Sequence, residues 1–408
     1  MPTDSLFSGL KVVDCASFIA GPAATTVLAD FGADVVKIEP PGLGDTYRHL
    51  NRIAPNPPLA EQYTWQVTNR NKRGLCLDLK NPQSAEVIAR LARWADVFVT
   101  NYPPRVRKAL KVTYEDLAPL NPRLIYADIT GFGEAGPEAD KPGFDITAYW
   151  ARSGLMQVTH DAGSPPTIPI PGIGDHATAS TLYGAIVTGL YRREKTGKGC
   201  RVGTSLIAEG AWAAAEFIEG ALNGGKFFPQ HNRSDPPNAL VNPYRTSDNR
   251  WLMLVVQGKD FVGFAQAIGR PALVEDPRFA DRKELARNAK ALVEVLDPLF
   301  ASQPLAHWKK VLEDGRVIFG VVQNAQDILN DPQMHANKIF MPVRDPSVGA
   351  QFTVSSPQQV AGVEKVEPRR APRIGEHSQE ILAELGYSTS DIDRLVSAQT
   401  VAIDRRAD

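Results

Sequence analysis

"LKVVDCASFIAGPAATTVLADFGADVVKIEPPG", residues 10–42, contains two β-branched runs on either side of a segment rich in small residues. The runs at 11–15 and 33–39 predict strands, and two prolines end the second one. Between them, Pro22 suits the first turn of a helix and Gly32 suits its C-terminal cap. Strand, helix and strand in this order predict a βαβ unit, which implies a parallel sheet with a right-handed crossover.

The same alternation continues along the chain. Strands are predicted at 73–80, 96–102 and 123–133, and an amphipathic helix at 81–95 with Asn81 as its N-cap. Together these segments predict an α/β fold with an open, mostly parallel, Rossmann-like sheet. Such sheets bind ligands beyond the carboxyl ends of their strands, so the loops of interest are "SFIAGP", "EPPGLGD", "TNYPPR" and "TGFGEAGP".

The length of 408 residues allows two domains. Residues 1–225 are expected to form the large α/β domain, completed by 335–408. A linker-like stretch is followed by strand and helix patterns that predict a smaller α/β domain at 226–334.

Composition excludes several classes of function. A net charge of -1, with 43% hydrophobic and 22% charged residues, is typical of a globular protein and does not favour nucleic acid or membrane as the main partner. Three scattered cysteines predict neither a disulfide framework nor a zinc site. The N-terminus lacks the apolar core of a signal peptide, and no segment is long and apolar enough to span a bilayer. We therefore expect a cytoplasmic protein.

Common cofactor and hydrolase motifs are absent. The first strand–helix turn contains one glycine instead of G-x-G-x-x-G, so a nicotinamide or flavin cofactor is not expected, and Glu39 is as readily a solvated carboxylate as a ribose ligand. Neither a Walker A loop nor G-x-S-x-G occurs, and the histidines show no metal-ligand spacing. No metal and no tightly bound cofactor are expected.

Asp175, in "IPGIGDHATAS" at 170–180, has two interpretations. It begins a predicted helix, so its carboxylate suits an N-terminal cap. A carboxylate beside small residues is also suited to nucleophilic attack on an acyl group, and a helix N-terminus favours the ionised form. Spacing alone does not decide between a cap and a nucleophile.

Two clusters of basic residues flank predicted strands. They contain Arg70, Lys72 and Arg73 in "NRNKRG", and Arg105, Arg107 and Lys108 in "PPRVRK". A solvated surface is one explanation, and a phosphate site is the other, since Arg and Lys both bind phosphate oxygens. Their position on one sheet favours the phosphate site.

Several ordered motifs resemble one known family, the class III coenzyme A transferases of the formyl-CoA transferase and carnitine CoA-transferase type. The resemblance is carried by residues 10–42 and by "NRNKRGLCLDLK", "DVFVTNY", "LIYADITGFGEAGP", "KTGKGCRV" and "APRIGEHSQEILAELG". It implies an enzyme that moves coenzyme A from an acyl-CoA to a carboxylic acid. Its members are homodimers in which each chain forms a ring interlocked with the other.

The resemblance implies that Asp175 is the nucleophile. Its carboxylate would attack the acyl-CoA thioester to give an aspartyl–acyl anhydride, and the released thiolate would convert this into an aspartyl-CoA thioester. The acceptor acid would then reverse the steps. No ATP is needed, but water must be excluded from both intermediates.

The same resemblance places the CoA nucleotide over the loops of the sheet. The implied CoA-binding positions are Ile19, Ala20, Leu77, Asp78, Lys80, Asn101, Tyr102, Phe144 and Asp145. Lys72 and Arg73 are predicted phosphate contacts on charge alone, and Arg105 is a further candidate. This sequence departs from the family at Pro103, where an arginine is frequent, and at Arg105, where a glycine is frequent.

A related branch contains the 2-methylacyl-CoA racemases, which use a histidine before the aspartate of "GHD", paired with the later aspartate, to move a proton on and off the α-carbon. Here the triplet is Gly143, Phe144 and Asp145, and phenylalanine carries no proton. Racemisation remains the alternative activity, and a CoA-binding protein without catalysis a third. The acids are not identified; Arg48, His49 and Arg52 are candidates for anchoring a dicarboxylate, or they are surface charges.

Overall fold

The computed structural model describes residues 5–52, 56–57, 59, 62–226, 230–344 and 350–404. The chain forms two compact units. One contains Met1–Gln157, Ile168–Asn223 and His335–Asp408, and the other contains Val158–Thr167 and Gly224–Met334. In the described residues, no helix has the length and apolarity needed to cross a membrane.

The larger unit is built on a seven-stranded sheet in the order β12-β3-β2-β1-β4-β5-β6. Its strands are β1 Lys11–Cys15, β2 Asp34–Glu39, β3 Arg73–Leu77, β4 Val97–Thr100, β5 Ile125–Thr130, β6 Cys200–Ser205 and β12 Val401–Ala402. All neighbours pair in parallel except β12 with β3. The predicted mostly parallel α/β sheet is therefore confirmed, and its strand order reverses between β1 and β4.

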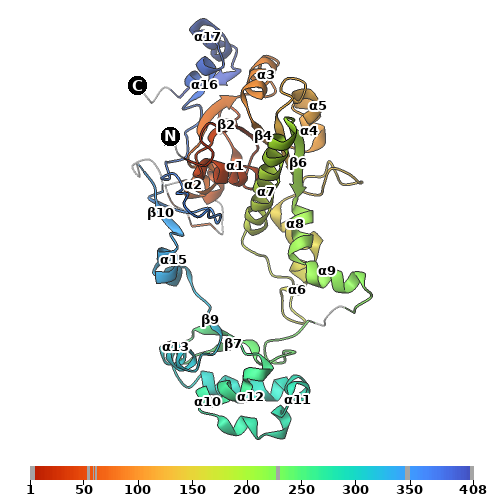
Figure 1. Ribbon diagram of the computed structural model, residues 1–408, viewed down its shortest axis with the longest axis vertical. Helices are drawn as coiled ribbons and strands as arrows, with labels where there is room; N and C mark the ends of the chain where they lie inside the picture. Colours follow the sequence, from red (N-terminus) through yellow and green to blue (C-terminus); the bar gives the residue numbers. More distant parts are fainter. Residues whose placement is uncertain are drawn as a thin grey trace. The chain divides into compact units, whose positions relative to one another are not determined.

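Alternating side chains of the strands form two cores, one on each face of the sheet. Val12 faces α1, Ala20–Asp30, and α7, Ile173–Thr196, which lie side by side on one face (Figure 1). Val13 faces the opposite core, which includes residues of α3, Ser84–Trp94. The small residues of α1 explain its complete burial, because alanines allow close packing against α7 and the sheet.

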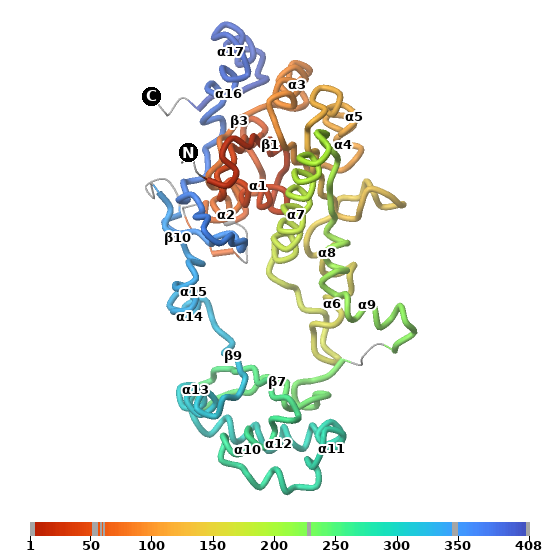
Figure 2. Tube along the Cα trace, viewed as in Figure 1, coloured from red at the N-terminus to blue at the C-terminus, as the bar shows by residue number. Residues whose placement is uncertain are grey.

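The C-terminal segment returns to the strand that lies next to β2. The helix α16, Ser378–Glu384, packs against β3, and β12 pairs with β3. Figure 2 shows α16 beside β3. The helix α17, Thr389–Ser397, follows α16 and contributes Ile392 and Leu395 to the same core. A hairpin of β10, Phe340–Pro342, with β11, Phe352–Val354, precedes them.

The remaining helices of the larger unit connect these strands. They are η1 Thr46–Arg52, α2 Tyr63–Asn69, α4 Pro104–Leu110, α5 Tyr114–Leu117, the π-helix η2 Asp145–Ala151, α8 Leu206–Ala213 and α9 Ala215–Leu222. The short helix α6, Leu155–Val158, ends at the boundary between the units.

Two predicted helix starts are wrong. The helix α7 begins at Ile173, so Asp175 is its third residue and not its N-cap. The helix α3 begins at Ser84, and Asn81 instead accepts a hydrogen bond from the Gln83 amide (3.0 Å) in the preceding turn. Asp175 lies two residues after the first residue of α7, and Asn81 lies three residues before the first residue of α3.

The smaller unit has its own sheet and core. Its strands β7 Val241–Arg245, β8 Trp251–Val255 and β9 Phe319–Val321 are antiparallel. Its helices are α10 Phe261–Ala267, α11 Arg282–Arg287, α12 Ala289–Phe300, α13 Leu305–Asp314, α14 Ala325–Leu329 and α15 Pro332–Ala336. The last of them, α15, crosses the boundary between the two units. Three short 3-10 helices connect these elements: η3 Gly258–Asp260, η4 Pro271–Val274 and η5 Pro277–Phe279. Tyr244, Leu254, Phe264 and Trp308 are among the residues of its core.

Candidate active site

A pocket of about 90 Å³ lies where the strand order reverses, at the carboxyl ends of β1, β4 and β5. It is lined by Phe18, Ile19, Ala20, Asn101, Ile129, Thr130, Gly131, Gly143, Phe144, Asp175 and Leu206. This crevice is the expected ligand site of a doubly wound sheet. Asp175 is the only ionisable side chain among these described lining residues.

The start of α7 shows which carboxylate is the cap. Asp145, which is 3% exposed, accepts hydrogen bonds from the backbone amides of Gly172 (2.6 Å) and Gly174 (3.0 Å). These amides belong to the first turn of α7, whose N-terminal N–H groups have no intrahelical partner. The capping role that the sequence offered to Asp175 is therefore performed by Asp145, from η2.

Asp175 is left with a free carboxylate. It is partly buried, and no donor for it is found among the described residues. Burial raises the pKa of Asp175 to about 7, and the nearby Asp145 charge adds to the shift. Desolvation thus opposes the ionised form that the helix N-terminus was expected to favour.

The loop between β1 and α1 forms one wall of the pocket. The Ser17 amide donates to the side-chain oxygen of Asn101 (2.9 Å), and the Asn101 amide donates back to the Ser17 carbonyl (2.7 Å). Phe18 has a φ of 62°, in the left-handed region. Its ring meets that of Phe144 edge to face, with centroids 5.6 Å apart.

Four of the predicted CoA-binding residues meet at this pocket: Ile19, Ala20, Asn101 and Phe144. Phe144 is 58% exposed, so its ring is accessible to a ligand. Asp145 does not line the pocket, and its two carboxylate oxygens accept from the amides of Gly172 and Gly174. These contacts do not favour a direct contact of Asp145 with CoA, which stays a prediction from the family resemblance.

The other predicted CoA contacts lie outside the pocket. Leu77 is fully buried in the core, Asp78 accepts the Lys80 amide (3.0 Å), and Lys80 is exposed. Tyr102 packs against the same core as Leu77, and the Arg105 side chain is exposed. Leu77 offers no surface to a ligand, because a fully buried strand residue is enclosed by its neighbours.

Lys72 does not fit the predicted phosphate contact. Its side chain is fully buried, and its ammonium donates to Asp14 (2.8 Å), the Pro22 and Thr68 carbonyls and the side-chain oxygen of Asn69. Burial lowers the pKa of Lys72 to about 8 despite the Asp14 partner. These acceptors leave the ammonium no access to a nucleotide.

Arg73 is similarly committed to internal partners. Its guanidinium donates to Asp34 (2.7 Å), Glu380 (2.9 Å) and Glu384 (2.9 Å), and so ties β3 to β2 and α16. Both predicted phosphate contacts are therefore corrected to structural ion pairs.

The candidate dicarboxylate anchors also differ from expectation. Arg48 is buried, pairs with both oxygens of Glu39 (2.6 and 2.7 Å), and stacks on Trp65 at 3.9 Å. Glu39 is accordingly 1% exposed and not a solvated strand end. His49 lies 3.2 Å from the Leu43 carbonyl, and the Arg52 side chain lies outside the described residues.

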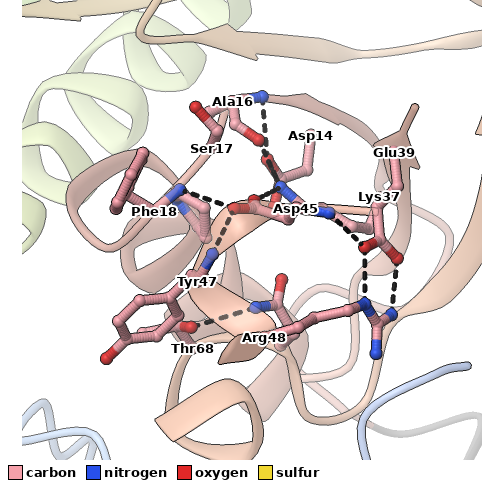
Figure 3. A network of polar contacts seen from close by, with 12 residues as sticks. Asp14, Ala16, Ser17, Phe18, Lys37, Glu39, Asp45, Tyr47, Arg48 and Thr68 are labelled. Carbon is pink, nitrogen blue, oxygen red and sulfur yellow. Dashed lines mark hydrogen bonds and ion pairs between the residues drawn. The ribbon is translucent and has the colours of Figure 1, made fainter. Parts of the chain in front are cut away.

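A buried charge network behind the pocket was not predicted. Lys37 pairs with Asp45 (3.1 Å) and Asp14 (3.8 Å), and Asp14 also pairs with Lys72. Figure 3 shows Asp45 between the Phe18 amide and Lys37. A charged residue within the apolar run "DVVKIE" is the signal that could have revealed it, since a buried charge requires a partner.

The relatives of this chain include enzymes that act on acyl-CoAs. It is 31% identical to (R)-2-hydroxy-4-methylpentanoate CoA-transferase of Clostridioides difficile, over 97% of this chain and 99% of the relative. It is also 31% identical to succinyl-CoA:glutarate CoA-transferase of Homo sapiens, over 96% and 89%. One similar solved structure is a CAIB/BAIF family protein from Brucella suis, with a TM-score of 0.81 and 28% identity over 93% of this chain and 99% of that one. Another is Rv3272 from Mycobacterium tuberculosis, with a TM-score of 0.78 and 27% identity over 92% of this chain and 98% of that one.

The mostly parallel sheet and these relatives define the chain as a transferase enzyme of the α/β class. The family described as CoA-transferase family III matches residues 7–378, and the chain belongs to it. The predicted membership is confirmed.

Proposed function

We propose that the protein transfers coenzyme A from an acyl-CoA to a carboxylic acid through Asp175. The observation that carries the proposal is a single carboxylate, free of hydrogen bonds from described residues, in an apolar pocket at the switch point of the sheet. Such a group attacks an activated acyl carbon as a nucleophile.

The proposed cycle needs only this carboxylate and the substrates. An Asp175 oxygen forms a bond to the thioester carbon and CoA leaves as the thiolate, which gives the mixed anhydride. The thiolate attacks the aspartyl carbonyl of the anhydride and releases the donor acid, leaving Asp175 as a CoA thioester. The acceptor carboxylate repeats these steps in reverse. The apolar walls Phe18, Ile129 and Leu206 support exclusion of water from both intermediates.

CoA itself is proposed to pass Ile19, Ala20, Asn101 and Phe144 on its way to Asp175, because these residues line the pocket. Asp78, Lys80, Tyr102 and Arg105 remain predictions from the family resemblance, and an interlocked homodimer and a cytoplasmic location also remain predictions. Exposed Tyr191, Trp212 and Leu222 support association between chains, which light scattering on the purified protein tests.

Transfer is favoured over racemisation by Phe144. A two-base racemase needs a proton carrier at this position, opposite the carboxylate of Asp175, and a phenylalanine ring carries no proton. Incorporation of solvent deuterium at the α-carbon of an acyl-CoA, without any acceptor acid, would instead establish the racemase.

The described residues lining the pocket include no cationic side chain. A dicarboxylate acceptor would leave its second charge without a partner among them, so we propose monocarboxylic acids with an apolar body as the preferred substrates. The relatives include enzymes named for both kinds of acid, such as cinnamoyl-CoA:phenyllactate and succinyl-CoA:mesaconate CoA-transferases.

Trapping the covalent intermediate tests the proposed function. The protein is incubated with acetyl-, butyryl-, isovaleryl-, cinnamoyl-, succinyl- or glutaryl-CoA without acceptor, digested and analysed by mass spectrometry. A productive donor is expected to add the mass of CoA less one water to the peptide containing Asp175. Exchange of labelled acid into acyl-CoA without modification of Asp175 would rule the mechanism out.

The rate of adduct formation is expected to rise with pH and to level off above the pKa of Asp175. Burial raises that pKa to about 7, and only the ionised carboxylate is nucleophilic, so the rate is lost as the pH falls through this value. Single-turnover rates in mixed buffers measure the midpoint. A flat profile between about pH 5 and pH 8 would contradict the assigned environment of Asp175.

A further inference from the structure

The turn that joins β1 to α1 has an unfavourable backbone conformation. Phe18 adopts a φ of 62°, which costs free energy for any residue with a Cβ and is rare for an aromatic residue. Such a conformation persists only where its surroundings hold it, and it is concentrated at functional sites. Here it directs Phe18 toward Phe144 and brings Ile19 and Ala20 into the pocket of Asp175.

Hydrogen bonds from two other loops hold this turn. Asn101, at the end of β4, binds both the amide and the carbonyl of Ser17. Asp45, after β2, accepts the Phe18 amide (3.2 Å) and the Tyr47 amide (3.0 Å) with the same oxygen. The Phe18 amide therefore depends on the exact place of one buried carboxylate.

Asp45 is fixed in turn by a fully buried lysine. Its second oxygen accepts from Lys37 (3.1 Å), which also donates to the Ala16 carbonyl in the same turn. Burial alone would lower the pKa of Lys37, but the charges of Asp14, Asp45 and Glu39 outweigh it and raise that pKa. Lys37 thus remains a cation that holds Asp45 and the turn together (Figure 3).

The turn contacts the helix that bears the nucleophile. A methyl group placed on Gly172, the N-cap residue of α7, would lie 3.1 Å from Cδ1 of Ile19. Displacement of the turn would therefore move both a wall of the pocket and the contact at the start of α7.

We propose that Asp45, held by Lys37, is a positioning residue that keeps Phe18 in its left-handed conformation and so sets the distance between the Ile19–Ala20 wall and Asp175. The role rests on the proposed function, because Asp45 acts through the turn and touches no substrate. Its effect should appear in the rate of attack more than in the affinity for CoA.

The test compares Asp45→Asn in two backgrounds. In the natural sequence, the single-turnover rate of adduct formation at Asp175 is expected to fall on the order of 10²-fold, because misplacement by about 1 Å costs this much. Affinity for free CoA, measured by calorimetry, should change by less than about threefold. In a Phe18→Gly background the same change should cost only a few-fold, because glycine adopts positive φ without restraint. Equal losses in both backgrounds would overturn the proposal.

A second readout does not depend on catalysis. Hydrogen exchange of the peptide spanning 16–24 should accelerate in Asp45→Asn, because asparagine has only one acceptor oxygen, which cannot serve both Lys37 and the Phe18 amide; unchanged exchange would also overturn the proposal. If the natural protein forms no adduct with any donor, the proposed function fails and this readout alone decides the role of Asp45.

The matched control is Asp30→Asn. Asp30 is also buried and pairs with Arg70 through two hydrogen bonds (2.8 and 2.7 Å), at the opposite end of α1. The Asp30→Asn substitution should leave the hydrogen exchange of residues 16–24 unchanged. Its effect on the single-turnover rate should be the same in the natural sequence and in the Phe18→Gly background. If Asp45→Asn does not accumulate as folded protein, Asp45→Ser takes its place with the same expected outcomes, because the serine hydroxyl is one bond too short to replace the contacts with the Phe18 amide and Lys37.

Discussion

Asp175→Asn is expected to lower CoA transfer by on the order of 10⁴-fold or more, because removal of a covalent nucleophile leaves only binding and positioning. The side chain keeps its size, and CoA affinity should persist because Ile19, Ala20 and Asn101 are unchanged. Initial rates with the best donor and acceptor of the acyl-CoA panel measure the loss. Retention of more than about one hundredth of the activity would show that Asp175 is not the nucleophile.

The same substitution is expected to stabilise the fold at high pH. Because burial raises the folded pKa of Asp175 to about 7 from 3.8, the folded state loses stability as the pH rises between these two values, and the loss is complete above the higher one. A shift of about three pKa units corresponds to roughly 4 kcal/mol of stability. Partial exposure of the carboxylate and the helix dipole reduce the expected gain to about 2 kcal/mol. The gain should be present at pH 8 and vanish below about pH 4, as urea unfolding at both values measures.

Glu194→Gln is the control for both effects. Glu194 is an exposed carboxylate near the other end of α7, so its removal should change stability by less than about 0.5 kcal/mol and leave transfer intact. A loss of activity in Asp175→Asn that came with a loss of stability would instead indicate a structural role.

The fold was predictable because its signals are local. In residues 10–42 the β-branched runs, Pro22 and Gly32 each specify a boundary, and β1, α1 and β2 form close to the expected positions. The switch point depends on the order of the strands in the sheet, which local sequence patterns do not specify. It results from the pairing of β4 with β1.

The site was only partly predictable because its partners are distant in sequence. Sequence spacing could not separate a cap from a nucleophile at Asp175, because the actual cap, Asp145, comes from another helix. Likewise, Lys72 belongs to a run of basic residues that resembles a surface patch, yet its carboxylate partner Asp14 lies 58 positions away. Charge along the chain shows that a cation exists, whereas only the fold shows whether it is free.

Gly174→Ala is expected to disable the site by displacing the start of α7. A Cβ at Gly174 would lie 2.2 Å from Cγ of Tyr149 and 2.3 Å from Oδ1 of Asp145, both far below contact distance. Helix propensity alone would favour alanine by about 1 kcal/mol. Overpacking costs about 1–3 kcal/mol, and loss of the cap that Asp145 provides costs about 1 kcal/mol more. These costs together exceed the gain in helix propensity.

We therefore expect Gly174→Ala to lower the free energy of unfolding by about 2 kcal/mol and the transfer rate by on the order of 10²-fold, because Asp175 follows directly on the displaced residue. Gly184→Ala is the matched control on the same helix. Among the described residues, no atom other than those of the two chain neighbours and the helix's own backbone lies within 4 Å of a Cβ at Gly184. Only helix propensity therefore changes there. That variant should gain up to about 1 kcal/mol and keep full activity. Urea unfolding and single-turnover rates of the two variants test this prediction. If both variants showed the same stability and the same rate, the close packing of Tyr149 and Asp145 against Gly174 would not position the nucleophile.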